Sequence, residues 1–390
     1  MTPLDVVLVV LLVAALATGL TRGVLSTVGG LVGLVLGGAV AFLAVPVVVD
    51  ALPVSEWRGA ATVLLAVAVP LLGLSLGAGV GRRLRQQVDR TRAVPLERLL
   101  GGVASLLVAA VALSFVGSTI KATGTPVLAP AVSSSAVLRA IDAYTPAPVT
   151  RTLAQARAAV LDDGLPQLDG LLDPRRSRTV PAVDLADPAL EASAQSVARV
   201  WGTAYECGTG VTGSGFVAAP DRVVTNAHVV AGVERPLVEL PGRTAEEGRV
   251  VYYDPEADLA VVAVDGLDAT PLTIAPALER GDAAVVQGYP YGGPFTSTGA
   301  EVLDAGGVRI PASDGTGTVE RDVYALAATV HGGSSGGPVL SPDGEVVGVI
   351  FGQSQSDDEL AYGVTSTELM PVAARLADLD DAVAPGRCAA

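Results

Sequence analysis

Four long apolar stretches dominate about the first third of this 390-residue chain. They cover Leu4–Leu20, Val24–Val48, Ala60–Val80 and Leu99–Val116, and Asp5 is the only charged residue within them. A helix needs about 20 apolar residues to cross the hydrocarbon core of a bilayer. The first stretch lacks the basic N-terminal region of a signal peptide, and three more stretches follow it. We therefore predict four transmembrane helices rather than a cleaved leader.

The arginines between these stretches indicate their orientation. The loop after the first stretch carries Arg22, whereas the loop after the second carries Asp50 and Glu56 against a single Arg58. The loop after the third holds five arginines, Arg82, Arg83, Arg85, Arg90 and Arg92. Loops rich in Lys and Arg face the cytoplasm. The first and third loops are therefore expected inside, and everything after the fourth span outside the cytoplasmic membrane.

Glycines recur at four-residue spacing in two of the predicted spans. They are Gly29, Gly33 and Gly37 in the second span and Gly73, Gly77 and Gly81 in the third. This spacing lets helix backbones approach closely in lipid, which favours a packed four-helix bundle. The alternative is that glycine is simply common in membrane helices. In its general pattern this half resembles the colicin V production family of small membrane proteins.

Residues 118–195 form a connector rich in proline and alanine, with short helices expected at Ser135–Tyr144 and Val149–Asp163. Prolines punctuate it, so we interpret it as a tether without a core of its own. Arg175, Arg176 and Arg178 lie near its end, where we hypothesise that the chain is cut or cuts itself.

Charge and cysteine content exclude several kinds of partner. The formal net charge of −15 argues against nucleic acid as a partner, because proteins bind nucleic acid through basic patches on their surface. The chain has two histidines and two cysteines, Cys207 and Cys388, and no CxxC pair, so neither a metal nor another cofactor is predicted. Two free thiols and one long-range disulfide both remain open at this point.

After residue 195 the chain changes to short apolar runs separated by Gly, Pro and Asp, which is typical of an all-β sandwich or barrel. Examples of the expected strands are Arg199–Cys207, Gly213–Val217, Arg222–Asn226, Leu259–Val264, Ala283–Gln287, Val323–Ala328 and Val346–Phe351. A final helix is expected at Thr367–Leu379.

Three short sequence segments in this half contain candidate catalytic residues. Thr225–Val230 contains His228, Asp258 opens an apolar run, and Gly333–Pro338 contains Ser335 between glycines. A serine hydroxyl needs a hydrogen-bonded base to become a nucleophile, and the order His, Asp, Ser is that of the chymotrypsin class. Three other acids, Asp254, Asp265 and Asp268, are rivals for the acidic position. We favour Asp258 because a buried strand is expected directly after it.

From about Val200 onward, these segments make the chain resemble the trypsin- and HtrA-like proteases. The resemblance implies a chymotrypsin-like double β-barrel and a triad of His228, Asp258 and Ser335. It also implies an oxyanion hole made by the backbone N–H groups of Gly333 and Ser335. In digestive proteases an acid precedes the nucleophile and pairs with a freed N-terminus, but Ser334 stands there in this chain, so activation must be controlled otherwise.

The same resemblance implies a substrate pocket. Its floor is expected near Thr329, and Ile350, Phe351 and Gly352 are expected in the strand that pairs with substrate. No acid is present at that floor, so a preference for Lys or Arg is not supported. His331 lines the pocket or simply packs, and we hypothesise that it adds a pH dependence to activity.

Taken together, four spans, a tether and a protease domain resemble the membrane-anchored acid-resistance serine proteases of actinobacteria. The resemblance implies domains at 1–117, 118–195 and 196–390, and a Cys207–Cys388 disulfide. It also implies proteolysis of cell-envelope polypeptides, at the periplasmic face of the membrane, under acid or oxidative stress. Membrane lipid is the other expected partner.

The main alternative is a membrane scaffold or transporter-like protein with an idle protease domain. A chaperone-protease of the HtrA type is a further rival, although no PDZ-sized segment is expected after the protease domain.

Overall fold

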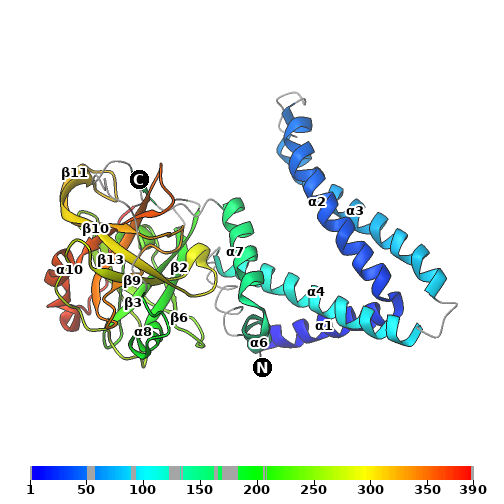
Figure 1. The fold of residues 1–390 in the computed structure, drawn as a ribbon, viewed down its shortest axis with the longest axis horizontal. Helices are drawn as coiled ribbons and strands as arrows, with labels where there is room; N and C mark the ends of the chain where they lie inside the picture. The colour runs from blue at the N-terminus through cyan, green and yellow to red at the C-terminus, as the bar shows by residue number, and fades with distance from the viewer. Residues whose placement is uncertain are drawn as a thin grey trace. The chain divides into compact units, whose positions relative to one another are not determined.

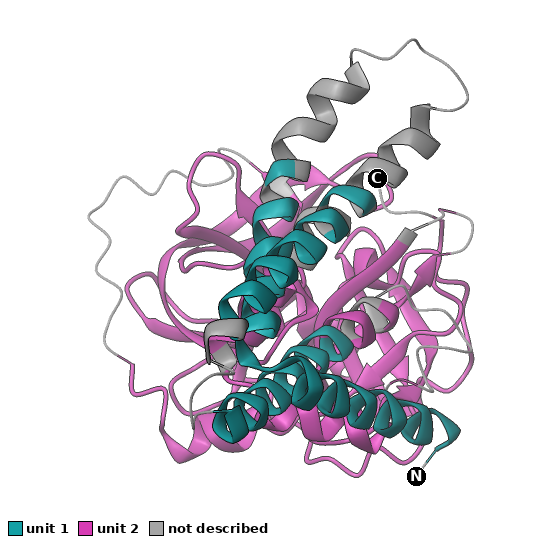
Figure 2. Ribbon diagram, turned by 90° about the vertical axis from the view of Figure 1, so that its right-hand side faces the viewer, with its two compact units in different colours: residues 1–114 teal, residues 115–390 magenta. Residues whose placement is uncertain are grey.

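The computed structural model describes residues 2–50, 58–88, 94–122, 132, 135–161, 166–168, 183–204, 207 and 209–387. The chain divides into two compact units, Met1–Ser114 and Phe115–Ala390, which Figure 2 distinguishes by colour. The first unit is helical, and every strand among the described residues lies in the second.

The helical unit contains α1 (Pro3–Arg22), α2 (Val24–Asp50), α3 (Arg58–Val88) and α4, which runs from Val94 to Ala122 across the boundary between the units. Among the described residues, two helices are long and apolar enough to cross a membrane, Pro3–Arg22 and Val94–Gly117. Helix α2 is also apolar over Val24–Gly38. These helices suggest membrane anchoring, whereas the predicted number of four spans is not established by them.

The two glycine faces of the sequence meet between α2 and α3. A Cβ atom at Gly33 would strike the carbonyl oxygen of Gly73, and one at Gly77 would strike that of Gly29. Gly81 lies in the same way against the backbone of Leu25. Side chains at these positions would force the helices apart, so the regular glycine spacing has a packing reason.

The connector contains helices and one very short strand. Helix α6 (Ala136–Tyr144) and helix α7 (Ala147–Leu161) lie close to the predicted ranges, and α8 (Pro188–Ala194) precedes the sheets. Strand β1 (Gln167–Leu168), which the sequence did not predict, pairs in parallel with Gln353 and Ser354. The proposed cleavage region at Arg175, Arg176 and Arg178 lies outside the described residues.

The described strands of the second unit form two seven-stranded sheets (Figure 1). The first has the order β1, β13 (Val346–Ser354), β12 (Pro338–Leu340), β9 (Ala283–Gly288), β10 (Thr296–Pro311), β11 (Thr318–Ala327) and β14 (Leu360–Thr365). The second has the order β6 (Glu246–Glu247), β5 (Leu237–Glu239), β2 (Val197–Ala204), β3 (Thr209–Ala219), β4 (Arg222–Thr225), β8 (Leu259–Ala263) and β7 (Arg249–Asp254).

The first sheet curls until it closes on itself. Strand β13 pairs with β12 and also with β14, so the strands from β13 through β12, β9, β10 and β11 to β14 form a ring. The end strands of the second sheet, β6 and β7, are not paired with each other within the described ranges. A β-rich domain with curled sheets is therefore present, as expected, and a complete double barrel remains a prediction.

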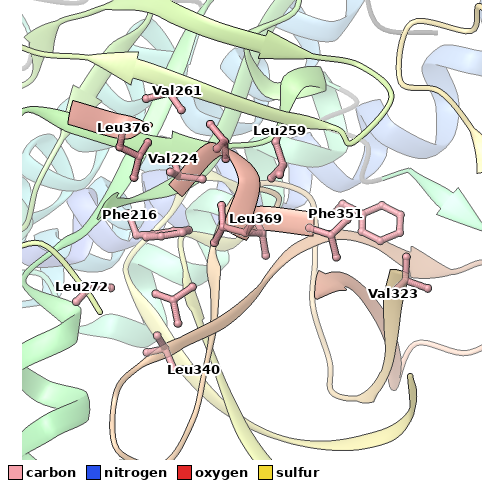
Figure 3. Packing of buried hydrophobic residues seen from close by; sticks show 14 of the residues in the cluster. Phe216, Val224, Leu259, Val261, Leu272, Val323, Leu340, Phe351, Leu369 and Leu376 are labelled. Carbon is pink, nitrogen blue, oxygen red and sulfur yellow. The ribbon is translucent and has the colours of Figure 1, made fainter. Parts of the chain in front are cut away.

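One apolar cluster joins the two sheets. Phe216 and Val261 come from the second sheet, Leu340 from the first, and all three are buried with Leu369 (Figure 3). Leu369 belongs to α10 (Ser366–Ala373), whose buried face fills the space that both sheets share. Burial of this apolar surface is the main force holding the sheets together.

The C-terminal helix is shorter than predicted. Apolar spacing suggested one helix over Thr367–Leu379, but α10 ends at Ala373 and a separate 3₁₀ turn covers Leu376–Asp378. Arg375 between them has ψ near 0°, outside the α-helical range, which interrupts the helix. Because Leu369, Val372 and Leu376 remain buried in one cluster, the apolar spacing alone could not reveal the interruption.

Candidate active site

His228 lies in a short helix directly after a buried strand. Strand β4 ends at Thr225, and α9 (Ala227–Val230) follows with Asn226 at its N-cap position. The Asn226 side chain is fully buried, and its Nδ2 donates to the carbonyl oxygen of Asp258 at 2.8 Å. Since β4 pairs with β8, this bond holds together the two strand ends that carry the histidine and the acid.

Two hydrogen bonds join His228 to Asp258. Nδ1 of the ring lies 2.8 Å from Oδ2 of the carboxylate, and the backbone N–H of His228 donates to Oδ1 at 3.0 Å. The acid side chain is 3% exposed and the histidine 13%. A buried carboxylate bound to Nδ1 favours the tautomer with its proton on Nδ1, which leaves Nε2 free to accept one. The pair is therefore arranged as a base and its orienting acid.

The backbone of Asp258 is unusual. Its φ of +54° lies in the left-handed region, which few residues other than glycine adopt. Such conformations concentrate at functional sites, where the surrounding structure imposes them. Here this conformation places the carboxylate directly before the first residue of β8, where it faces the histidine.

Ser335 lies in a glycine turn that packs against the end of β4. The serine is 3% exposed, and its carbonyl oxygen accepts the N–H of Ser214 at 2.7 Å. Gly336 has a φ of +83°, and a Cβ atom there would strike the Ser214 carbonyl oxygen and Oγ1 of Thr225. Only glycine fits at this position. The turn thus contacts the strand that leads directly to His228.

Two backbone donors of the turn are not engaged. The N–H of Ser334 donates to the carbonyl oxygen of His331 at 2.9 Å. The N–H groups of Gly333 and Ser335, by contrast, have no hydrogen-bond acceptor among the described residues. Buried backbone donors are nearly always paired, so two unpaired donors in one tight turn are suited to receive an anionic oxygen.

The Ser335 turn and the helix of His228 both lie next to Gly213 of β3. No bond joins Oγ of Ser335 to the His228 ring in the part of the chain that is described. A Cβ atom at Gly213 would lie 3.0 Å from the Ser335 carbonyl oxygen and 2.6 Å from Cγ1 of Val229, the neighbour of His228. Both elements therefore flank one residue of β3. Catalytic hydrogen bonds often shorten only when substrate binds.

His331 packs against a loop that supports the serine turn. Its ring stacks on Tyr291, with the ring centroids 4.8 Å apart. Tyr291 belongs to the 3₁₀ turn Pro290–Gly292, has a φ of +59°, and donates its N–H to the carbonyl oxygen of Gly332. This turn was not predicted from the sequence, and it braces the chain immediately before Gly333.

Burial lowers the pKa of His331 below its usual 6.5, and the negative charge of Asp358 partly offsets that effect. The unfolded chain therefore binds this proton at a higher pH than the folded chain, so stability falls as the pH drops below about 6.5. We expect the melting temperature of the parent to fall more steeply than that of His331→Gln between pH 7 and 5, as measured by thermal unfolding. Parallel curves throughout would contradict this expectation. The same two proteins give the pH–rate profiles that test an effect on activity.

The residues predicted in the substrate-pairing strand, Ile350, Phe351 and Gly352, are all buried. Ile350 is fully buried and Phe351 is 2% exposed. The N–H of Ile350 donates to the Gly337 carbonyl oxygen at 2.9 Å, and its own carbonyl accepts the N–H of Gly336 at 2.8 Å. Ile350 thus anchors the serine turn, and its backbone is not free to pair with a peptide.

The predicted floor residue is accessible, whereas the end of the predicted substrate strand contacts the tether. Thr329 is exposed. A Cβ atom at Gly352 would lie 2.9 Å from the carbonyl oxygen of Pro166, and Gln353 donates its N–H to that oxygen at 3.2 Å. The edge of β13 can therefore accept an extended backbone, because it already pairs with one.

The predicted cysteine pair is only half described. Cys207 is described, whereas Cys388 lies outside the described residues. The Cys207–Cys388 disulfide therefore stays a prediction.

Comparisons with known proteins agree with this geometry. Residues 213–349 match the sequence profile of the trypsin-like peptidase domain, and residues 4–146 match that of the colicin V production protein. The serine protease Rv3671c of Mycobacterium tuberculosis is 33% identical over 384 residues, covering 95% of each chain. A probable periplasmic serine endoprotease, DegP-like, of Ectopseudomonas mendocina is 28% identical over 58% of this chain and 45% of its own.

A solved structure resembles just over half of the chain. The crystal structure of the Rv3671c protease from M. tuberculosis in its active form superposes with a TM-score of 0.51. It is 36% identical and covers 57% of this chain and 100% of the crystallised one. The β-rich fold, the oriented histidine and these matches together define a trypsin-like serine protease, and the chain is a serine endopeptidase. Over almost its whole length, it belongs to the family of the mycobacterial serine protease Rv3671c.

Proposed function

We propose that this protein is a multi-pass membrane endopeptidase that cleaves cell-envelope proteins outside the cytoplasmic membrane, with His228, Asp258 and Ser335 as its triad. The observation that carries the proposal is the doubly hydrogen-bonded Asp258–His228 pair beside the Ser335 turn. The unengaged N–H groups of Gly333 and Ser335 support an oxyanion hole at that turn. A scaffold with an idle protease domain is not favoured, because it gives no reason for this arrangement.

The proposed reaction follows the geometry of these groups. Oγ of Ser335 attacks the scissile carbonyl carbon while Nε2 of His228 accepts the hydroxyl proton. Asp258 stabilises the imidazolium, and the two N–H groups stabilise the negative oxygen of the tetrahedral intermediate. The C–N bond then breaks as His228 returns the proton to the leaving amine. Water, activated by His228, attacks the acyl-enzyme and releases the carboxylate product together with free Ser335.

We place the protease domain at 196–390, after a four-span bundle at 1–117 and a tether at 118–195. Arg85 supports this arrangement of spans, since its Nη1 donates to the Thr21 carbonyl oxygen at 2.6 Å and its Nε lies 3.4 Å from Oε2 of Glu97. These contacts join the ends of α1, α3 and α4. The loops after the first and third spans then share one side of the membrane, as the arginine distribution requires.

Two finer features belong to the same proposal. We infer a Cys207–Cys388 disulfide, because the N–H of Gly232 donates to the Pro385 carbonyl oxygen at 3.1 Å while a Cβ at Gly232 would lie 3.2 Å from the Cys207 sulfur. The C-terminal tail therefore approaches Cys207. We also infer that the second sheet completes a second barrel, as in the chymotrypsin-like fold. Self-cleavage at the arginines of the tether is the remaining inference.

The proposed role is proteolysis in acid or oxidative stress, and envelope proteomics tests it. Cells carrying the parent protein or Ser335→Ala are compared at neutral and acid pH. We expect a set of envelope proteins to persist, or to keep uncleaved forms, only in Ser335→Ala cells, with a larger set at acid pH. Identical envelope proteomes in both strains at both pH values would refute this role, although not the chemistry.

A further inference from the structure

Ser214 is a fully buried serine in the middle of β3 for which the triad gives no role. A buried hydroxyl is unfavourable unless it is hydrogen-bonded. Its Oγ donates to the carbonyl oxygen of Gly333 at 2.7 Å and accepts the N–H of Tyr289 at 2.9 Å. The side chain therefore links β3 to the serine turn and to the residue that follows β9.

The backbone of Ser214 contacts the same site. Its N–H donates to the carbonyl oxygen of Ser335 at 2.7 Å, and its carbonyl accepts Oγ1–H of Thr225 at 2.7 Å. One residue thus holds the carbonyl groups of both Gly333 and Ser335. These are the two residues whose N–H groups form the proposed oxyanion hole.

The serine turn needs such a restraint because Gly333 is intrinsically mobile. It adopts a φ of +88°, and a Cβ there would lie 2.6 Å from the carbonyl oxygen of Tyr289, so no larger residue fits. Glycine populates several backbone conformations at little cost. The planar peptide between Gly333 and Ser334 is held at both ends, its C=O by Ser214 Oγ and its N–H by the His331 carbonyl at 2.9 Å.

We propose that Ser214 is a positioning residue whose hydroxyl keeps the Gly333 and Ser335 N–H groups directed at the developing oxyanion. Without it, the Gly333 carbonyl and the Tyr289 N–H both lose their partner. The peptide after Gly333 then keeps only the bond from its N–H to the His331 carbonyl, so its orientation is less tightly fixed. The inference rests on the proposed function, since it presupposes that these N–H groups bind the oxyanion. It predicts a defect in the transition state rather than in substrate binding.

Ser214→Ala in the full-length enzyme in detergent tests the proposal. Removing one oxyanion donor costs about 10²- to 10³-fold in kcat, so disturbing two donors through their support is expected to lower kcat by about 10- to 100-fold. KM for a fluorogenic peptide taken from a casein cleavage site should change by less than about twofold, because ground-state contacts remain. The rate constant for labelling by a fluorophosphonate should fall in parallel with kcat, since its phosphoryl oxygen occupies the same hole.

Three further variants make the result interpretable. Ser214→Cys keeps a weaker donor and should fall between the parent and Ser214→Ala. Ser196→Ala removes another buried hydroxyl, which donates to the Thr270 carbonyl oxygen at 2.6 Å away from the serine turn, and should keep the parent kcat. Ser335→Ala reports on the proposed function itself, so retained activity there would overturn that function and not merely the role of Ser214.

The following results would contradict the proposed role of Ser214. A folded Ser214→Ala enzyme with the parent kcat, or with a loss confined to KM, overturns the inference. So does a fluorophosphonate rate that stays unchanged while kcat falls. Should Ser214→Ala not fold by thermal unfolding, the same criteria apply to Ser214→Cys, whose kcat must then lie below that of the parent and of Ser196→Ala.

Discussion

Replacing Ser335 by alanine is expected to lower kcat/KM on fluorescein-labelled casein by about 10⁵-fold or more, because the nucleophile and its covalent intermediate are lost together. The fold should survive, since no hydrogen bond among the described residues uses Oγ of Ser335 and alanine fits wherever serine does. Initial rates and fluorophosphonate labelling of the full chain measure the loss. Thermal unfolding checks that the variant is folded.

Ser341→Ala is the matched control for this substitution. Ser341 lies just after β12, is 8% exposed, and accepts the N–H of Glu345 through Oγ at 3.3 Å. Its replacement removes a comparably buried hydroxyl, so activity should remain within about twofold of the parent. If Ser335→Ala keeps more than about one-tenth of the parent rate, a different nucleophile operates and the triad is wrong.

Two of the predicted strands are buried along their whole length. Strands β4 and β8 are buried at every position, so their apolar runs indicated strands directly. Strand β10 escaped prediction because it is mostly partly exposed and contains Gly306 and Gly307. Its conformation depends on pairing with β9 and β11, which local sequence does not reveal. Strand β1 has only two residues and likewise exists through its partner β13.

The residues proposed to act in catalysis were easier to predict from the sequence than the residue that holds the serine turn in position. Local motifs and chain order predict His228, Asp258 and Ser335 as the triad, and the structure brings the first two into contact. The role of Ser214 could not be derived, because its partners Gly333 and Tyr289 lie 119 and 75 positions away. The only local signal was a serine placed between Gly213 and Gly215 in a strand, where small neighbours permit close backbone approach.

Asp258→Asn is expected to lower kcat by about 10⁴-fold without unfolding the protein. The amide would keep one oxygen to accept the backbone N–H of His228, but its NH₂ group would face Nδ1 of the ring. A donor at that point favours the tautomer with the proton on Nε2, so His228 could no longer accept a proton from Ser335. Steady-state kinetics measure the loss, and ¹⁵N spectra of the histidine ring report the change of tautomer.

The rival acids provide the control for this prediction. Asp254 is engaged elsewhere, since its carboxylate accepts the Tyr252 hydroxyl at 2.9 Å and the N–H of Glu256 at 2.9 Å. Asp265 is 83% exposed and pairs with Arg249, so Asp265→Asn should retain kcat within about twofold. The assignment of Asp258 fails if Asp258→Asn behaves like Asp265→Asn. It also fails if kcat drops while the ring keeps its proton on Nδ1, because the carboxylate would then act on something other than the histidine.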